Sequence, residues 1–160
     1  LGDALAVCLM KYRNFQKEDF ASFHPGGTLG KRLFVRVRDM MRTKNLPIIG
    51  IQTPLKEAIT VMSEGRLGSV LLVDEAGKLA AILSDGDLRR ALMQEDFSLE
   101  HACVRYATKN PKTFTNENML ASDALALIES YKIQLVVITD TQARPIGVLH
   151  IHDLVEAGIQ

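Results

Sequence analysis

Two short segments carry residues whose types and spacing suit the binding of a phosphorylated sugar or nucleotide. They are Ser84-Asp85-Gly86-Asp87 and His150-Ile151-His152-Asp153, and each follows an apolar run of strand length. A helix that starts at such a junction offers free N–H groups to a phosphate. A carboxylate one turn into the helix can accept hydrogen bonds from two sugar hydroxyls, and the Ser84 hydroxyl can donate to a phosphate. We therefore predict ligand-binding residues at both junctions.

Neighbouring basic residues extend this predicted site. Arg89 and Arg90 follow the first junction, and arginine makes bidentate contacts with phosphate. In the second junction, His150 can hydrogen-bond a ligand, or add positive charge when it is protonated. The predicted ligand-binding set is Ser84, Asp87, Arg89, Arg90, His150, His152 and Asp153.

A purely structural interpretation of the same residues stays open. Ser84-x-x-Asp87 resembles a helix capping box, with Asp in place of the usual Glu. His150 is a poor N-cap residue, so capping explains the second junction less well. Arg89 and Arg90 would then lie on an exposed helix face. The sequence alone does not separate capping from ligand contact.

Metal and nucleophile chemistry have little support. His150 and His152 are alternate residues of an extended segment and would point to opposite faces, and no acidic or Cys cluster completes a ligand set. We predict neither a metal nor a cofactor. His24, in His24-Pro25-Gly26-Gly27, is the one residue outside the repeats described below that invites a catalytic interpretation. Its alternative role is to order a loop.

An internal repeat must position the two junctions. When the sequence is shifted by 66 residues it aligns with itself without a gap. Identical pairs include Val70 with Val136, Asp74 with Asp140, and Asp87 with Asp153, and the apolar positions between them also coincide. A period of this kind indicates a duplicated structural unit.

Each copy predicts the order β-α-β-β-α. In the first copy, Pro54 begins a helix, strands follow at 69–73 and 79–83, and a second helix starts after Ser84. The second copy has a helix near 119–131, strands at 135–139 and 145–149, and a helix near 151–157, while short strands near 48–51 and 113–115 precede the copies. Continuous apolar strands indicate burial on both faces.

The composition narrows the function classes. Lys and Arg number 19, Asp and Glu also number 19, and 47% of the residues are hydrophobic, so the chain is globular and has no excess of cations. We therefore predict no nucleic-acid partner. Cys8 and Cys103 are too few for a disulfide framework, and we interpret both as small buried residues. No apolar run approaches the ~18 residues that span a bilayer, and no signal peptide is visible, so we predict no membrane partner.

The N-terminal region lies outside the repeats. Residues 3–12 have a helical apolar stripe, and the glycines of 24–30 demand an irregular backbone. The basic run from Lys31 to Lys44 is interpreted as a solvated linker helix. Because the sequence begins at Leu1, within a helical pattern, we expect it to be a fragment of a longer protein.

The duplicated unit with its strand-Ser-x-x-Asp-Leu junction resembles the CBS domain pair over residues 36–158. Val37-Arg38-Asp39-Met40-Met41 matches the segment that opens a CBS repeat, whereas Val104-Arg105-Tyr106-Ala107-Thr108 lacks its Asp-Met pair. The resemblance implies an α/β fold of two repeats, 36–95 and 98–158, packed with pseudo-two-fold symmetry. CBS pairs commonly bind nucleotides and transmit that binding to an attached domain.

A second resemblance covers the whole chain. Leu1-Gly2-Asp3-Ala4-Leu5-Ala6, His24-Pro25-Gly26-Gly27 and Ser84-Asp85-Gly86-Asp87-Leu88-Arg89-Arg90, in this order, look like the C-terminal half of the D-arabinose 5-phosphate isomerase family, with Ser84 where Thr is usual. That family joins a sugar isomerase (SIS) domain to a CBS pair. Residues 1–34 would then be the helical tail of a missing α/β isomerase domain and its linker.

This second resemblance implies a cytoplasmic enzyme that interconverts D-ribulose 5-phosphate and D-arabinose 5-phosphate for Kdo synthesis, in lipopolysaccharide or capsule. His24 falls on a motif whose histidine is implicated in acid–base catalysis, a task that suits a group titrating near neutrality. The phosphate-binding loop would lie in the missing part, so we predict no isomerase activity for this chain alone.

Two functions of different classes follow from the resemblances. One is a regulatory pair that binds a nucleotide-type effector, CMP-Kdo or AMP. The other is a dimerisation module without a ligand, whose interface comes from the apolar helices at 54–65 and 119–131. Family habit further implies a homo-oligomer, with a CBS-mediated dimer and a tetramer of the parent enzyme.

Overall fold

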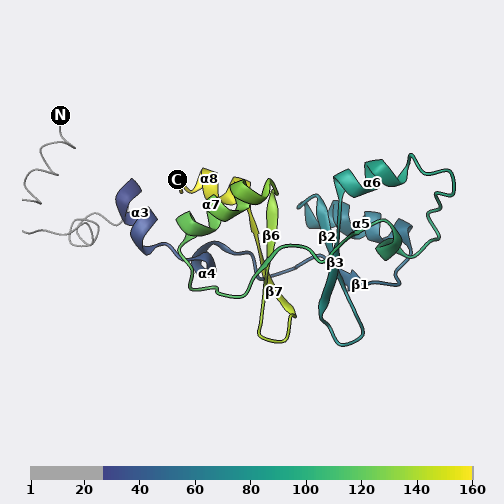
Figure 1. Cartoon of the computed structure of the whole chain (residues 1–160), viewed down its shortest axis with the longest axis horizontal. Helices are drawn as coiled ribbons and strands as arrows, with labels where there is room; N and C mark the ends of the chain where they lie inside the picture. Colours follow the sequence, from purple (N-terminus) through teal and green to yellow (C-terminus); the bar gives the residue numbers. More distant parts are fainter. Residues whose placement is uncertain (1–26, 160) are drawn as a thin grey trace, which may run out of the picture. The chain divides into compact units, whose positions relative to one another are not determined.

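The computed structural model describes residues 27–159 (Figure 1). The chain divides into two compact units. The sheet unit consists of Met41–Asn116 and Leu135–His150, and the described part of the helical unit consists of 27–40, Glu117–Gln134 and 151–159.

The helices and strands that the repeat predicts occur in the predicted order, among the elements that the structure describes. These elements are α3 (Thr28–Phe34), α4 (Val37–Met40), β1 (Ile48–Gly50), α5 (Leu55–Gly65), β2 (Ser69–Val73), β3 (Leu79–Ser84), α6 (Asp85–Ala91), a 3-10 turn (Cys103–Arg105), β4 (Thr108–Lys109), β5 (Thr113–Phe114), α7 (Ala121–Tyr131), β6 (Leu135–Thr139), β7 (Pro145–His150) and α8 (Ile151–Glu156). One sheet has the strand order β1-β2-β3-β4 and the other β5-β6-β7. Within each sheet the first pair is parallel and the next antiparallel, so both copies form the expected β-α-β-β-α unit.

The offset of 66 residues extends to fine details of the backbone. The antiparallel pairing shifts register between Leu72 and Val73 in β2, and between Ile138 and Thr139 in β6. Asp74 Oδ1 accepts backbone N–H groups two and four residues later, at 2.9 Å each, and Asp140 does the same. The two copies therefore share turn chemistry as well as apolar pattern.

Strands β2 and β6 of the sheet unit are almost fully buried, as their continuous apolar sequence predicts. Val70 and Leu72 of β2 pack into a core with residues of α5, α6 and the 3-10 turn. Leu71, between them, packs with Val137 and Val148 of the other sheet. Because successive side chains of a strand point to opposite faces, one strand contributes to both clusters.

Helix α5 shows how the segment 95–107, which follows α6, completes the first repeat. The helix begins after Pro54, where a missing N–H is tolerated, and it ends at Gly65. The amides of Leu55 and Lys56 donate to the carbonyls of His101 and Leu99, at 2.9 and 3.0 Å. Backbone groups that a helix start leaves unpaired are thus satisfied by the 95–107 segment.

The prediction of one solvated linker helix in the basic run is wrong. The chain forms α3 and then α4, with extended backbone at Val35 between them. Lys31 Nζ donates to the carbonyl of Ala157 at 2.7 Å, and the guanidinium of Arg42 donates to the carbonyls of Gly65 and Asn45. These cations bind backbone oxygens, a role that spacing along the run does not reveal.

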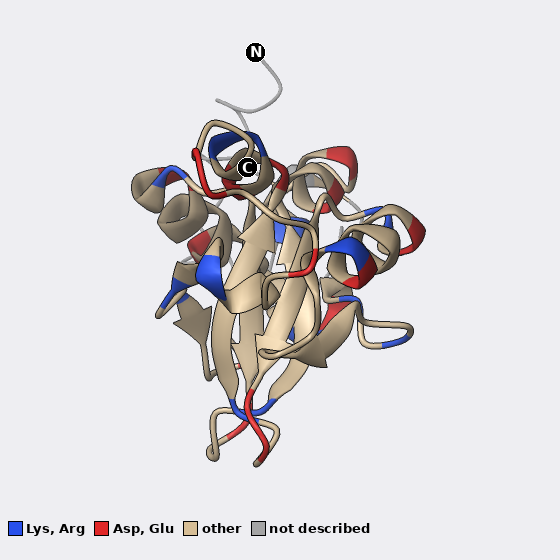
Figure 2. Cartoon of the chain, turned by 90° about the vertical axis from the view of Figure 1, so that its right-hand side faces the viewer, with Lys and Arg blue, Asp and Glu red and all other residues tan. Residues whose placement is uncertain are grey.

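In the cartoon of Figure 2, residues of both charge signs are spread over helices and hairpin turns, while the strands are largely uncharged. Cys103 is fully buried and free, as predicted, and Cys8 lies outside the described residues. Among residues 27–159, no helix is both long enough and apolar enough to cross a bilayer.

Candidate ligand site at the first strand–helix junction

The first junction is a complete capping box. Ser84 ends β3 in an extended conformation, with φ −107° and ψ 168°, and its Oγ accepts the N–H of Asp87 at 3.2 Å. The carboxylate of Asp87 reaches back and accepts the N–H of Ser84 at 2.9 Å. This confirms the capping interpretation of the spacing, with Asp replacing Glu.

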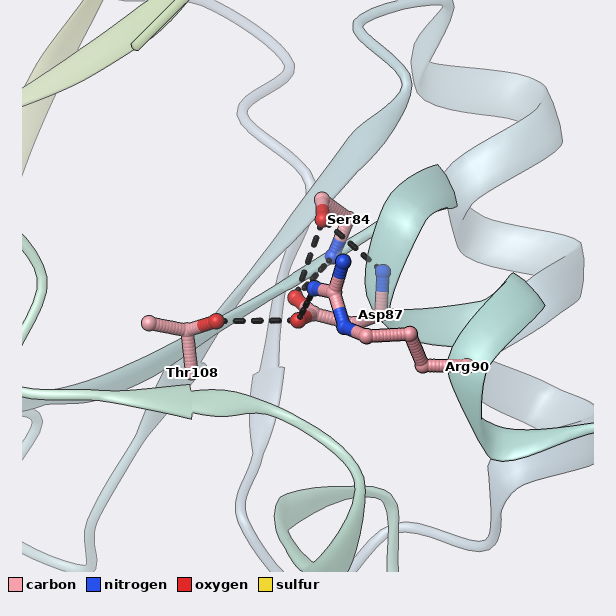
Figure 3. A network of polar contacts seen from close by, with 4 residues as sticks. All are labelled: Ser84, Asp87, Arg90 and Thr108. Carbon is pink, nitrogen blue, oxygen red and sulfur yellow. Dashed lines mark hydrogen bonds and ion pairs between the residues drawn. The ribbon is translucent and has the colours of Figure 1, made fainter. Parts of the chain in front are cut away.

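The Asp87 carboxylate accepts further hydrogen bonds from three side chains (Figure 3). Its Oδ2 also accepts from the hydroxyl of Ser84 at 2.9 Å. Its Oδ1 accepts from Nη2 of Arg90 at 2.6 Å and from the hydroxyl of Thr108 at 2.9 Å. Both oxygens therefore hold two donors, and these four residues form what we call the Asp87 cluster.

The electrostatics of the cluster favour an ionised carboxylate. Burial of Asp87, which is only 5% exposed, acts to raise its pKa. The hydrogen bonds from the Ser84 amide, the Thr108 and Ser84 hydroxyls and Arg90 outweigh this effect and hold the pKa of Asp87 below its usual value. A buried anion at the end of a strand is a strong acceptor for hydroxyl or cationic groups.

Arg90 is an exposed member of the cluster. Its side chain is 71% exposed, in contrast to the buried carboxylate that it contacts. A Cβ placed on Gly86 would lie 3.5 Å from Nη1 of Arg90 and 3.6 Å from Oγ of Ser84. The guanidinium therefore folds back over the first turn of α6, beside Ser84.

Thr108 is a member of the cluster that the sequence analysis missed. It lies on β4, which pairs antiparallel with β3 so that Thr108 is opposite Ile82. The segment Val104–Thr108 was noted only for its departure from the CBS pattern. The signal in the sequence is weak, because one hydroxyl residue 21 positions from Asp87 has no local pattern.

The other predicted residues are distributed over the two units. Arg89 is exposed on α6, and His150 is half-buried at the end of β7 in the sheet unit. His152 and Asp153 are exposed on α8 in the helical unit. The carboxylates of the two copies thus differ, since Asp87 is buried and Asp153 is exposed. His24 lies outside the described residues.

The Asp87 cluster can hold an uncharged polyhydroxyl group or a cation at Oδ1, and an anion at the Arg90 guanidinium. No group of three or more His, Cys, Asp or Glu is placed to hold a metal ion in the part of the chain that the structure describes. The chemistry on offer is binding through hydrogen bonds and charge.

Sequence comparison finds relatives over the whole chain. An uncharacterized protein of Helicobacter pylori is 51% identical over 160 residues, which cover 100% of this chain and 48% of that protein. The arabinose 5-phosphate isomerase KdsD of Pseudomonas aeruginosa is 43% identical, over 99% of this chain and 49% of that protein. The chain therefore spans about half the length of the curated relatives it matches.

Solved structures share the fold. CBSX2 in complex with AMP superposes with a TM-score of 0.68 at 21% identity, covering 79% of this chain and 97% of that one. A CBS domain protein of Pyrobaculum aerophilum complexed with AMP gives 0.67 at 21% identity, covering 75% and 90%. The CBS domain model matches residues 37–94 and 104–159. With both halves of the duplication matched, the chain belongs to the CBS domain family, as a tandem pair.

Proposed function

We propose that this chain is the regulatory CBS pair of an arabinose 5-phosphate isomerase and that it binds a nucleotide-type effector at the Asp87 cluster. The observation that carries the proposal is the buried, ionised carboxylate of Asp87, which lies beside the exposed guanidinium of Arg90. A ribose diol suits the first group and a phosphate suits the second. AMP in the two fold neighbours and the name of the Pseudomonas relative support the ligand class and the parent enzyme.

CMP-Kdo and AMP are the effectors we propose, the first because it offers a phosphate, a ribose and a carboxylate in one molecule. Ser84, Asp87 and Arg90 would contact the ligand, with Arg89 beside them on α6. His150, His152 and Asp153 are proposed for the second copy. We further propose that the pair acts in the cytoplasm, within a homo-oligomer.

Calorimetric titration of the chain with AMP, ATP, CMP and CMP-Kdo tests this function. We expect heat of binding for at least one of them, and its loss in Asp87→Asn, which removes the charge but keeps the shape. Asp123→Asn, at an exposed position of α7, removes one acidic charge away from the cluster and should bind as the wild type does. No heat with any of the four, at protein concentrations above ~0.1 mM, would remove the sensing role.

For the parent enzyme we propose interconversion of D-ribulose 5-phosphate and D-arabinose 5-phosphate, with His24 as an acid–base residue. The isomerisation moves a proton between adjacent carbons, which a group titrating near neutrality can do. The test is His24→Ala in the full-length enzyme, compared with this chain alone. We expect a large loss of turnover in the variant, and we expect no turnover at all from the isolated chain. Undiminished turnover of the variant would reject the role of His24.

A structural module without a ligand is the second candidate. It is favoured by the full occupation of the Asp87 carboxylate by donors of the chain itself. Exposed apolar side chains after α6, among them Met93 at 84%, are also available for contact with another subunit. If this candidate is correct, Asp87→Asn lowers the stability of the chain, and the calorimetric titrations with the four nucleotides show no binding for the wild type or the variant.

A further inference from the structure

The Asp87 carboxylate is saturated before any ligand arrives. An ionised carboxylate offers about four acceptor positions, two on each oxygen. Ser84 fills those of Oδ2 through its amide and its hydroxyl, while Arg90 and Thr108 fill those of Oδ1. A ribose diol that binds Asp87 must therefore displace donors that the chain already supplies.

The two oxygens differ in how easily their donors can leave. At Oδ2, one donor is a backbone amide of the capping box, and the Ser84 hydroxyl is also fixed because it accepts the amide of Asp87. At Oδ1, both donors are side chains of exposed residues, Arg90 and Thr108. Displacement at Oδ1 leaves the capping box intact, so a ligand competes for this oxygen.

Displacement of Arg90 has an electrostatic consequence. A neutral diol restores the hydrogen bonds of the carboxylate but not the positive charge beside it, so the buried anion loses its counter-ion. The guanidinium released already lies over Gly86, in the first turn of α6. A phosphate brought in by the same ligand would give this cation a new partner at short range.

We propose that Arg90 is an exchangeable counter-ion, whose guanidinium moves from Asp87 to the phosphate of the ligand when a sugar diol takes its place at Oδ1. The inference rests on the proposed function of the Asp87 cluster and adds its selectivity. Arg90 makes the site reject nucleosides, which break the ion pair and offer no anion in return, and accept nucleotides, which offer both groups.

Arg90→Gln tests the exchange with two matched ligand pairs, AMP with adenosine and CMP with cytidine. We consider the pair whose nucleotide the wild type binds. Calorimetric titration of the variant should show the affinity for that nucleotide lowered by roughly tenfold or more, since a charge-assisted contact with phosphate is lost. The nucleoside should bind about twofold to fivefold more tightly, because no ion pair between Arg90 and Asp87 has to be broken first. The two affinities change in opposite directions. If Arg90 only bound the phosphate, the nucleoside would be unaffected, and if Arg90 only blocked the carboxylate, both ligands would bind more tightly.

Arg144→Gln is the matched control. It removes the same charge from an exposed position next to β7, and its side chain lies against Gly77, at the other end of β3 from Ser84. It should leave all affinities unchanged. If Arg90→Gln weakens the nucleotide but leaves the nucleoside unchanged, or shifts both in one direction, the exchange is overturned while the proposed function stands. If the wild type binds CMP-Kdo or ATP but neither AMP nor CMP, the exchange is overturned while the proposed function stands, because AMP and CMP carry both groups that the exchange needs. If it binds none of these nucleotides, the proposed function itself fails, and the exchange falls with it.

Discussion

The hydroxyl of Thr108, on β4, donates a 2.9 Å hydrogen bond to the carboxylate of Asp87, on α6. β4 lies in the second repeat, and it pairs with β3, which leads into α6. The Asp87 carboxylate of the first copy is thus hydrogen-bonded to a strand of the second repeat. Under the proposed function, a ligand that takes over Oδ1 would break this hydrogen bond and so weaken the connection between the two repeats.

Replacement of Thr108 by Val keeps the shape and removes the hydroxyl. We expect the free energy of unfolding to fall by about 1 kcal/mol, the net contribution of one hydrogen bond at a partly exposed site. Urea unfolding measures this as a lower midpoint with an unchanged slope. Thr113→Val, at an exposed position of β5, is the control and should leave the midpoint in place. Equal midpoints for Thr108→Val and wild type would contradict the importance of this contact.

Replacement of Ser84 by Ala removes the acceptor for the Asp87 amide and one donor to its carboxylate. The expected loss of stability is about 1 kcal/mol, within the range of roughly 0.5–2 kcal/mol found for N-cap residues. Ser84→Thr keeps the hydroxyl and should unfold close to the wild type in the same urea titration. An Ala variant as stable as the Thr variant would show that the capping box does not stabilise α6.

The sequence predicted most of the fold because each element has a local signal. Strands 69–73 and 135–139 were predicted with the bounds that the structure gives, since both are continuous apolar runs that end at an Asp turn. β4 was missed because Thr108–Lys109 is short and exposed and has no apolar pattern. Its place at the edge of the sheet depends on β3, and no local pattern encodes that pairing.

The candidate site shows the same division between local and distant contacts. The spacing Ser84-x-x-Asp87 predicted the capping box, because all of its hydrogen bonds lie within one turn. Arg90 was predicted as a phosphate ligand from its neighbourhood, yet in the structure it pairs with Asp87 one turn before it. Thr108 could not be predicted, since its contact requires the sheet to form first.

Acid should destabilise the chain in part through Asp87. The pKa of this carboxyl is lowered in the folded state, so its contribution to stability is present above the unfolded value of about 3.9 and is lost as pH falls through the folded pKa. Between about pH 7 and pH 3, the free energy of unfolding measured with urea should therefore fall more steeply for the wild type than for Asp87→Asn. Thr108→Val, which lacks one of the hydrogen bonds that lower this pKa, should fall between them. Parallel curves for wild type and Asp87→Asn would contradict the prediction.

The thiol of Cys103 should resist modification in the folded chain. Burial raises the pKa of this thiol more than the amides of Cys103 and Val104 lower it, and the reactive thiolate is correspondingly scarce. The residue lies in the 95–107 segment and is fully buried in the core around α5. In a Cys8→Ser variant, which leaves one thiol, Ellman's reagent at pH 8 should react on the order of a hundredfold faster in denaturing urea than in buffer.

The pH dependence of this labelling separates the two causes of protection. If a raised pKa and burial both act, alkaline pH speeds the reaction of the unfolded chain up to its ordinary thiol pKa of about 8.5, whereas the folded chain stays slow beyond that point. Stability due to the thiol is fully present below the unfolded pKa and is lost as pH rises through the folded one, so urea midpoints should decline at high pH. Rapid stoichiometric labelling of the folded Cys8→Ser variant would show that the 95–107 segment opens readily, and that its closure over α5 contributes little to the fold.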